Sequence, residues 1–451
     1  MFCRLQQRCK RLHFFSTKFT QNEFQKNLNE GDPKTNTEFK KIINSYLGFI
    51  VLKPLPQSKI GRTCLKVFSD PAIPRHYTTT KTYQINLFGI DLSIESIAFQ
   101  QQDQEVAACA TTAIWVASQK TAEIFNSQLF SPSEITSLAI NSDHESRIFP
   151  ASGLNIREIC QAFRKIGLEI ELLEVENLDL LEMKSFIYAY LKYGIPIVLG
   201  FYIPNLGRHA VTITGYCFNN KINGPFMSDN IDKIYVHDDN IGPFARYTLT
   251  TTVIDKKTIP AIEVSHYSSF GTCPVISMIA PVYHKIRVPL TSVKIEKISA
   301  LDKFFESILN LPGIKLSLDY KEFVWDVFLT DVKKVKKHIL EDGNFSGIKE
   351  DILTTSFPRY LWEGSLYVNN NKILTLLFDA TDLRQNNFNL HSIYIYDQKI
   401  KDLLKLLLPY KAIINNPFIQ KLIIELEEYF KIPSNKIWRN QNENLHIFSL
   451  N

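Results

Sequence analysis

A cysteine at the start of an alanine-rich run is the feature that most constrains this chain. Residues 105–126 space their apolar side chains as a buried or half-buried helix does, and Cys109 lies near the beginning of that run. A helix N terminus carries partial positive charge and unpaired N–H groups, and both favour the thiolate, the attacking form of cysteine. Upstream of the thiol, Gln102 and Gln104 supply amides able to hydrogen-bond an oxyanion. We therefore expect a reactive thiol at a helix start.

A base and an acid suited to such a thiol occur further along the chain. The run Gly-Ile-Pro-Ile-Val-Leu-Gly (residues 194–200) predicts a buried strand that leads into Arg-His-Ala-Val-Thr-Ile-Thr-Gly-Tyr (208–216), a second strand that begins with His209. Farther on, Ile-Tyr-Val-His-Asp-Asp-Asn (234–240) predicts a strand that ends in carboxylates. Cysteine, histidine and acid therefore occur in the order that a Cys-His-Asp hydrolase needs.

Taken together, these motifs resemble the papain-like cysteine peptidases, and within them most closely the bacteriocin-leader-processing peptidases and their relatives. Three matches carry the resemblance: Gln-Gln-Asp before a cysteine that opens a helix, the Gly-Ile-Pro run that leads into Arg-His-Ala-Val, and Tyr-Val-His-Asp-Asp with a glycine soon after. The resemblance covers residues 95–281. It implies a papain-like α+β fold in which a helical half holds the cysteine and an antiparallel sheet half holds the histidine and the acid.

Carried over to this chain, the resemblance makes Cys109 the nucleophile and His209 its general base. Asp238 takes the position of the acid that orients the imidazole, because it follows the strand where the family's aspartate stands. Asp239 and Asn240 remain alternatives for that third position if the alignment shifts by one or two residues. One reacting residue opens a helix and its partner opens a strand, so the two are expected to meet across a cleft between the halves.

The sequence departs from the family pattern at two points. Ala110 follows the cysteine where the family often has glycine, and Asp103 stands six positions before Cys109. Gln102 and Gln104 flank that aspartate, so the glutamine that helps to bind the oxyanion in the family has two candidates here.

The resemblance implies cleavage of an amide or isopeptide bond in a peptide or protein substrate through a Cys-His-Asp triad. Such an enzyme needs no metal and no organic cofactor. Two alternatives stay open from the sequence. One is a cysteine acyltransferase, in which an amine replaces water as the acceptor. The other is a catalytically inactive papain-like scaffold that serves as a protein-binding or regulatory module.

The length of 451 residues predicts more than one domain. Changes in sequence pattern divide the chain into a basic, disordered tail (1–36), a β-containing N-terminal lobe (37–94), the papain-like peptidase domain (95–288) and a C-terminal α/β domain (289–451). The role of the last domain is open, and it is a candidate for binding a protein partner. Within the peptidase domain, caps at Ser131 and Asn155 predict two helices, the second of which ends at Gly167. Residues 367–379 predict a strand.

The net charge of +5 is confined to one end of the chain. Residues 1–20 contain five arginines and lysines and no acid, so the rest of the chain is neutral and has no basic footprint for nucleic acid. We expect the basic segment to be a disordered tail. The alternative is a mitochondrial-type presequence, which would direct the protein to an organelle.

The seven cysteines are scattered and form no CxxC pair. This pattern argues against a disulfide framework and a zinc knuckle, and it fits a reducing, cytoplasmic location. The longest uncharged candidate for a membrane span, residues 273–283, contains two prolines. It is also shorter than the roughly 18–20 residues that a span requires. We therefore expect no membrane span.

A few further residues suggest weaker sites. Asp379 and Asp382 end a predicted strand, where a turn is a simpler interpretation than a metal site. His237 lies beside the acids but has no second histidine at helical or strand spacing, so a metal site there is also disfavoured. Cys160 and Cys217 lie on apolar faces and are expected in the core.

Overall fold

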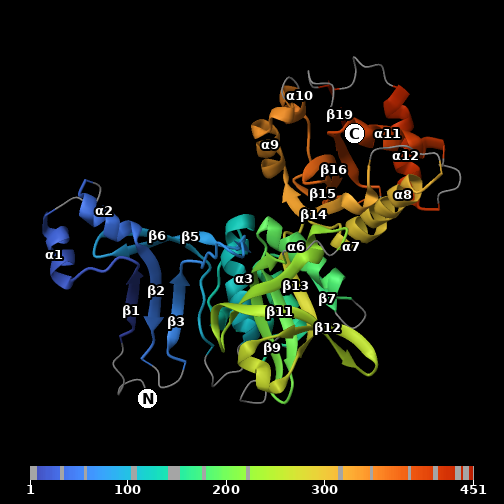
Figure 1. Ribbon diagram of the computed structural model, residues 1–451. Helices are drawn as coiled ribbons and strands as arrows, with labels where there is room; N and C mark the ends of the chain where they lie inside the picture. Colours follow the sequence, from blue (N-terminus) through green and yellow to red (C-terminus); the bar gives the residue numbers. More distant parts are fainter. Residues whose placement is uncertain are drawn as a thin grey trace. The chain divides into compact units, whose positions relative to one another are not determined.

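The structure, a computed structural model, describes residues 8–30, 35–54, 58–102, 109–140, 153–174, 179–219, 224–312, 318–345, 349–383, 388–409, 415–431, 438–439 and 446–449. These residues form a mixed α+β protein in which the strands of each sheet pair antiparallel (Figure 1). The α+β class expected from the sequence is therefore confirmed.

Two compact units make up the chain, and each is interrupted in sequence. Unit 1 contains Met1–Met183, Gly194–Phe218 and Asp232–Tyr283, and unit 2 contains Lys184–Tyr193, Asn219–Ile231 and His284–Asn451. The last segment of unit 2 starts close to the boundary expected near residue 288. Its two internal segments lie within the range 95–288, which we expected to be one domain. That expectation differs from the structure because contacts between residues far apart in sequence decide where these segments belong.

The N-terminal part of unit 1 is a small lobe built on a three-stranded sheet. Its strands are, in order, β1 (Lys10–Phe15), β2 (Tyr46–Leu52) and β3 (Ile60–Leu65), and helices α1 (Gln21–Glu30) and α2 (Thr37–Asn44) connect β1 to β2 (Figure 1). A hairpin of β5 (Lys81–Leu87) and β6 (Ile90–Ser96) joins the lobe through contacts of β6 with β2 and β3. Phe99 then pairs with Thr63 of β3 before the chain reaches the segment of Cys109.

Residues 10–30 correct the expectation of a disordered tail over residues 1–36. β1 pairs with β2 from Lys10, opposite Leu52, to Phe15, opposite Tyr46. The reason is nonlocal, because His13 and Phe15 both contact the ring of Tyr46, which lies more than thirty positions away in the sequence. The amino-acid composition of this segment shows only its positive charge. Its ordered structure depends on contacts with residues far away in the sequence, which composition does not reveal.

The larger sheet of unit 1 has eight strands and contains His209 and Asp238. Six strands follow the order β10, β11, β12, β13, β8, β9, and a further pairing of β9 with β10 closes them into a ring. Their inward side chains include the fully buried Phe201, Ile213 and Tyr247. The bounds are β4 (Arg75–His76), β7 (Glu169–Glu174), β8 (Ile197–Ile203), β9 (Gly207–Phe218), β10 (Ile231–Asp238), β11 (Gly242–Ile254), β12 (Lys257–Glu263) and β13 (Cys273–Val282).

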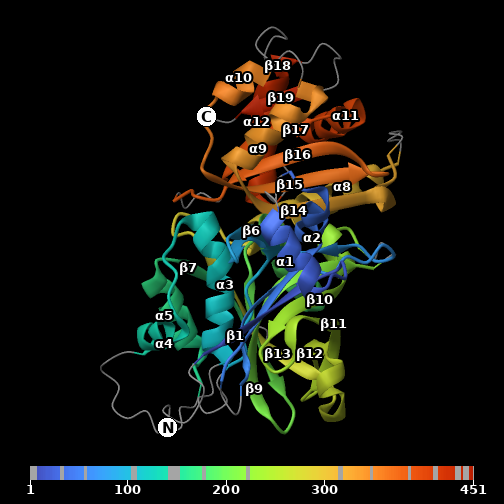
Figure 2. The same cartoon turned by 90° about the vertical axis from the view of Figure 1, so that its left-hand side faces the viewer.

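Three helices accompany this sheet, namely α3 (Cys109–Phe125), α4 (Pro132–Ala139) and α5 (Ile156–Ile166) (Figure 2). α3 is buried on nearly all sides and packs along β9, where the Thr212 hydroxyl donates a hydrogen bond of 2.8 Å to the backbone carbonyl of Ala113. α4 and α5 pack against each other and against α3. This packing fixes the start of α3 relative to β9.

The expected helix caps are confirmed. Ser131 and Asn155 each accept a hydrogen bond from the backbone N–H three residues later, and each heads a capping box. Gly167 ends α5 with a φ of 96°, the left-handed conformation that glycine adopts without steric cost.

Unit 2 is built on a six-stranded antiparallel sheet in the order β14, β15, β16, β17, β19, β18. The expected strand over residues 367–379 is a hairpin, in which Asn369 and Asn370 form the turn with φ values of 49° and 63°. The strands are β14 (Phe323–Asp331), β15 (Tyr360–Val368), β16 (Asn371–Asp379), β17 (Leu390–Ile395), β18 (Trp438–Arg439) and β19 (His446–Ser449). The helices are α6 (Leu180–Tyr193, mostly in unit 2), α7 (Leu290–Val293), α8 (Ser299–Leu309), α9 (Val332–Glu341), α10 (Lys349–Thr354), α11 (Gln398–Leu407) and α12 (Pro417–Lys431).

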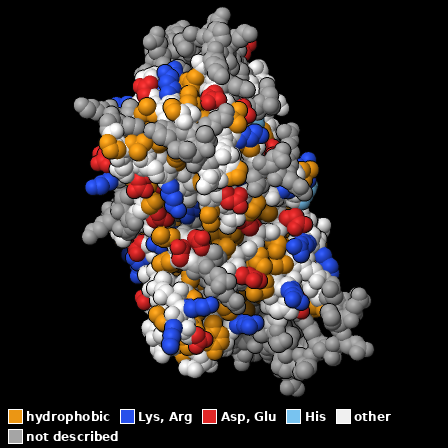
Figure 3. Space-filling model, turned by 90° about the vertical axis from the view of Figure 1, so that its right-hand side faces the viewer, with side chains coloured by type: hydrophobic (Ala, Val, Ile, Leu, Met, Phe, Trp, Pro, Cys, Tyr) orange, Lys and Arg blue, Asp and Glu red, His pale blue; other side chains and the backbone are white. Residues whose placement is uncertain are grey.

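Across the described residues, none of the helices combines the length and the apolar character needed to cross a membrane. On the face drawn in Figure 3, lysine and arginine side chains are interspersed with aspartate and glutamate rather than gathered by sign. That distribution agrees with the neutral charge of the chain after residue 20.

Candidate active site

The thiol of Cys109 lies at the first residue of α3. It is half-buried, whereas Cys9 is exposed and the thiols of Cys64, Cys160, Cys217 and Cys273 are buried. The core positions expected for Cys160 and Cys217 are therefore confirmed. Among the described cysteines, Cys109 combines partial access with a helix start, where backbone N–H groups favour a thiolate.

The imidazole of His209 is held by a buried carboxylate. His209 lies on β9 opposite Phe201 of β8, and its Nε2 is 2.9 Å from Oδ1 of Asp238, the last residue of β10. The side chains of His209 and Asp238 are 6% and 0% exposed. Because β9 pairs with β10, two residues 29 positions apart meet at one end of the ring of strands. A hydrogen bond of this length fixes the orientation of the ring.

Four donors surround the Asp238 carboxylate. The hydroxyls of Tyr247 and Tyr267 donate to Oδ2 at 2.6 and 2.9 Å, and the Asn240 backbone N–H donates to Oδ1 at 2.9 Å beside the His209 bond. Burial would raise the pKa of Asp238, but its hydrogen bonds and the nearby imidazole charge hold that pKa below its ordinary value. Asp238 is therefore ionised at neutral pH.

The pKa of the His209 imidazole is shifted in the opposite direction, upward. Burial would lower the pKa of His209, but its hydrogen bonds to Asp238 and Cys109, with the charges of Asp238 and Asp239, raise this pKa to about 10. The ring is therefore protonated at neutral pH. Since Nε2 bonds Asp238, Nδ1 is the nitrogen that remains for the thiol of Cys109. An imidazolium beside a sulfur stabilises the thiolate.

The other two candidates for the third position contribute differently. Asp239 Oδ1 lies 3.6 Å from His209 Nε2, beyond hydrogen-bond distance, and its Oδ2 is buried with no hydrogen-bond partner among the described residues. Burial and the charge of Asp238 raise the pKa of Asp239 to about 6, although His209 opposes the shift. The Asn240 side chain reaches the Tyr267 hydroxyl, at 3.4 Å. Of the three, Asp238 makes the short bond to the imidazole.

A metal ion has one conceivable set of ligands among the described residues. Ligand atoms of His209, Asp238 and Asp239 lie within 4.8 Å of one another. However, Nε2 of the histidine and Oδ1 of Asp238 already share a 2.9 Å hydrogen bond, and an ion between them would have to replace it. The set fits a hydrogen-bonded imidazole better than a metal centre.

A pocket of about 520 Å³ opens beside Cys109 and His209. Its apolar wall includes Ile156 and Ile159 of α5, Val198 of β8 and Ile279 of β13. Glu174 and Arg208 add two exposed charges to the lining. All of these residues belong to unit 1. The thiol therefore faces a space that accommodates an apolar side chain between polar ends.

The two amides expected at the oxyanion are not brought to this pocket by the described residues. Gln102 is half-buried at the end of the segment 58–102 and does not line the pocket. Gln104 lies in residues 103–108, outside the described residues. The oxyanion role of either glutamine stays a prediction.

Several site residues were not singled out from the sequence. The hydroxyls of Tyr247 and Tyr267 are the clearest examples, because nothing local to β11 or to the turn after β12 connects them with Asp238. The weaker candidates have structural roles. His237 is buried with Nε2 3.1 Å from the Ile97 carbonyl oxygen, and its Nδ1 accepts the Phe244 N–H. Asp379 caps a turn through the N–H and hydroxyl of Thr381.

No protein-family model matches the chain, and no curated protein sequence matches it significantly.

Proposed function

We propose that unit 1 is a papain-like cysteine hydrolase that cleaves an amide or isopeptide bond in a peptide or protein. The observation that carries the proposal is the position of the His209 imidazole, which hydrogen-bonds the buried Asp238 carboxylate and lines the same pocket as the Cys109 thiol. A helix that begins with the cysteine and a ring of antiparallel strands that holds the histidine and acid provide further support. Each member of a Cys-His-Asp triad has the partner that its chemistry needs.

Acylation begins from the thiolate and imidazolium pair. The sulfur of Cys109 attacks the carbonyl carbon of the scissile bond, and the electron pair of the C=O bond moves to the oxygen. Collapse of this tetrahedral intermediate expels the amine, which takes a proton from His209. The products are a thioester on Cys109 and a free amine.

Deacylation uses the same histidine as a base. The now neutral imidazole accepts a proton from water, whose oxygen attacks the thioester carbonyl. The carboxylic acid leaves, and the thiolate and imidazolium pair is restored. Asp238 keeps Nε2 occupied throughout, so that Nδ1 stays directed at the reacting atoms. The apolar pocket beside the thiol suits a large aliphatic or aromatic side chain of the substrate.

Alkylation by iodoacetamide at pH 6 tests the reactive pair without a known substrate. We expect Cys109 to be modified at least about tenfold faster than the exposed Cys9, because a thiolate and not a thiol is the nucleophile. The variant His209→Ala should reduce the Cys109 rate to that of Cys9. Equal rates in the unmodified chain, or a rate unaffected by His209→Ala, would refute the proposal. Peptide mapping by mass spectrometry supplies the individual rates.

Peptide-cleavage assays distinguish the hydrolase from an acyltransferase and from an inactive scaffold. A library of internally quenched peptides should be cleaved by the full chain and not by Cys109→Ser, with new carboxylate and amine ends at the cut. An acyltransferase would release product only when an amine acceptor is added. An inactive scaffold would be alkylated slowly and would cleave nothing.

A further inference from the structure

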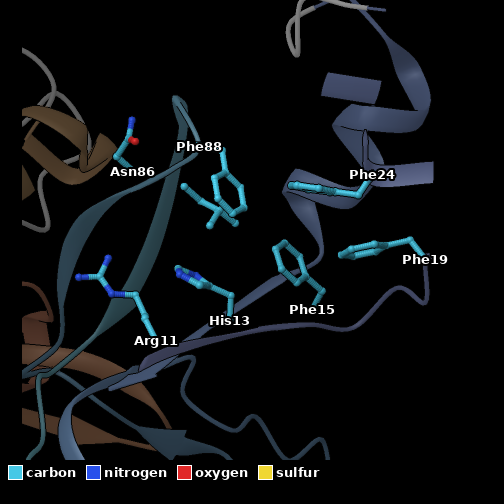
Figure 4. A pocket seen from close by; sticks show the side chains of 8 residues that line it. Arg11, His13, Phe15, Phe19, Phe24, Asn86 and Phe88 are labelled. Atoms are coloured by element: carbon cyan, nitrogen blue, oxygen red, sulfur yellow. The ribbon is translucent and has the colours of Figure 1, made fainter. Parts of the chain in front are cut away.

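A second pocket, of about 620 Å³, lies in the N-terminal lobe and has no part in the proposed hydrolysis. Figure 4 shows it between β1, the start of α1 and the turn of the β5–β6 hairpin. We call it the aromatic pocket and define it by Arg11, His13, Phe15, Phe19, Phe24 and Phe88. All of these residues belong to unit 1.

Phe88 is the least expected member of the aromatic pocket. It occupies the hairpin turn with a φ of 54°, followed by Gly89 at 86°, and such a turn favours asparagine, aspartate or glycine. A bulky side chain in the left-handed region is strained, and strained residues persist where function requires them. The ring is also 76% exposed. Folding therefore gains little from an aromatic side chain here.

The facing wall is a row of three half-buried phenylalanines. Phe15 and Phe19 meet edge to face with centroids 5.1 Å apart, and Phe19 stacks on Phe24 at 5.6 Å. Phe24 in turn faces Phe88 at 6.3 Å. Together these rings form an open apolar surface able to hold another large side chain.

β1 adds an unused backbone edge to this surface. It lies at the end of the β1–β2–β3 sheet, and within the described residues no strand pairs with its outer side. Its exposed N–H and C=O groups are a template for one more strand. An extended peptide added at such an edge gains main-chain hydrogen bonds, and a neighbouring pocket receives its side chains.

The charge around β1 specifies the peptide further. Arg11 stacks over Phe49, with the guanidinium carbon 4.8 Å from the ring centroid, and pairs with no carboxylate among the described residues. Residues 8–20 contain four basic side chains and no acid. The carboxylates of Glu23 in α1 and Asp91 in the hairpin hydrogen-bond the neutral donors of Thr20 and Asn86, so two acids stand against the four basic side chains of residues 8–20. This edge is therefore complementary to acidic residues.

We propose that the aromatic pocket and the outer edge of β1 bind an extended polypeptide segment that carries a large apolar side chain flanked by acidic residues. The apolar side chain enters between Phe88 and the phenylalanine row, and the flanking carboxylates face Arg11 and its basic neighbours. This proposal does not depend on the hydrolase activity of unit 1.

Fluorescence anisotropy with three labelled seven-residue peptides tests the proposal on the full chain. The first peptide has a central phenylalanine between valines, flanked by glutamate and aspartate. The second has lysines in place of the acids, and the third has serine in place of the phenylalanine. We expect saturable binding of the acidic aromatic peptide, with the other two at least about tenfold weaker, and weaker binding at high salt. Failure of the first peptide to saturate at millimolar concentration, or equal binding of the lysine peptide, would overturn the proposal.

Matched variants assign the binding to this site. Phe88→Asn removes the ring while suiting the positive φ, so the melting temperature should be unchanged or higher while affinity falls at least about tenfold. Arg11→Glu should weaken binding and Arg11→Lys should retain it. Val253→Asn, at another exposed hairpin position with 67% exposure, should change nothing. Unaltered affinity in both Phe88→Asn and Arg11→Glu would overturn the proposal.

Two other occupants are separable outcomes of the same series. If the peptide binds only after deletion of residues 1–7, the chain's own first residues fill the pocket. If sedimentation shows a dimer that dissociates in the Phe88→Asn variant, a second copy of the chain fills the aromatic pocket. Either result would overturn the assignment to a separate polypeptide.

Discussion

Two neighbouring carboxylates at the end of β10 have opposite environments. Asp238 accepts four hydrogen bonds and its pKa is lowered, whereas Asp239 leaves Oδ2 without a partner among the described residues and its pKa is raised to about 6. An uncompensated buried carboxylate weakens the folded state. Its presence 3.6 Å from the imidazole is understandable if its charge assists protonation of His209 at some expense in stability.

We expect Asp239→Asn to stabilise the protein at pH 8 and to have little effect at pH 4. The folded-state pKa of about 6 lies above the ordinary value of 3.8, so ionisation opposes folding and stability falls as the pH rises through this interval. The gain at pH 8 should reach at most about 3 kcal/mol. Urea unfolding at both pH values measures it. The control Asp255→Asn, on the exposed β11–β12 turn, should be neutral, and an equal effect of Asp239→Asn at both pH values would argue against this account.

Replacing Asp238 should act on the histidine rather than on the thiol directly. In Asp238→Asn the ring loses its anionic partner, so we expect the pKa of His209 to fall from about 10 toward its ordinary value. The imidazolium would then be lost as the pH rises through about 6.5, and alkylation of Cys109 at pH 7.5 should slow by about tenfold. Histidine NMR titration follows the first effect and mass spectrometry the second. An unshifted His209 titration would show that Asp238 does not control its charge.

At the scale of elements, α5 links a local folding signal to the site. Its N-cap Asn155 accepts the Glu158 N–H at 3.0 Å, and the same residue lines the pocket beside Cys109. The cap of α4, Ser131, has the same capping box but does not line the pocket. The two caps therefore form a matched pair. Both make the same capping hydrogen bonds, but of the two only Asn155 lines the pocket beside Cys109.

We expect Asn155→Ala and Ser131→Ala each to lower the free energy of unfolding by about 1 kcal/mol, the usual cost of losing a helix cap. Only Asn155→Ala should also raise the KM for a cleaved peptide, because it loosens the end of α5 that faces the thiol. Chemical denaturation and steady-state kinetics measure the two effects. Equal KM changes in both variants would show that the effect comes from general destabilisation.

Local chemistry explains which elements were predictable. The caps of α4 and α5 and the glycine stop at Gly167 depend on residues within one helical turn, and they were predicted correctly. β12 was not among the strands predicted from the sequence, and Pro260 in its middle is unfavourable for a central strand. The ladder with β13 covers only Ala261 and Ile262, so the proline lies beyond those hydrogen bonds.

The site shows the same division between local and nonlocal information. Cys109 begins α3, Asp238 ends β10 and His209 lies close to the start of β9, and such positions follow from sequence pattern. The donors Tyr247 and Tyr267 reach Asp238 only through the pairing of β10 with β11 and the folding of the turn after β12. Contacts of that kind have no signal in a single sequence.

At the scale of the whole molecule, the two units are interleaved along the chain. Most of α6 belongs to unit 2, yet the next strand, β8, lies in the ring of strands that holds His209. Within unit 2, Asp326 of β14 accepts the Tyr188 hydroxyl at 2.8 Å and pairs with Lys192 at 2.5 Å, so α6 is tied to residues far along the chain. The C-terminal region is therefore not a removable appendage.

A chain that ends at residue 288 should consequently fold poorly, although the sequence pattern suggested a domain boundary there. It retains α6 and residues 219–231 but lacks β14, so Tyr188 and Lys192 lose the Asp326 carboxylate and the Pro225 carbonyl loses the Trp325 N–H.

Asp326→Ala in the full chain removes the carboxylate alone and should cost about 3 kcal/mol in the free energy of unfolding, as expected when one partner of a largely buried ion pair is removed. Thermal unfolding and alkylation of Cys109 compare both with the intact protein. Because α6 leads directly into β8, we expect Asp326→Ala to lower the temperature at which Cys109 loses its selective reactivity. A truncated chain with an unchanged melting temperature and a selectively reactive Cys109 would show instead that unit 1 folds without the C-terminal part of unit 2.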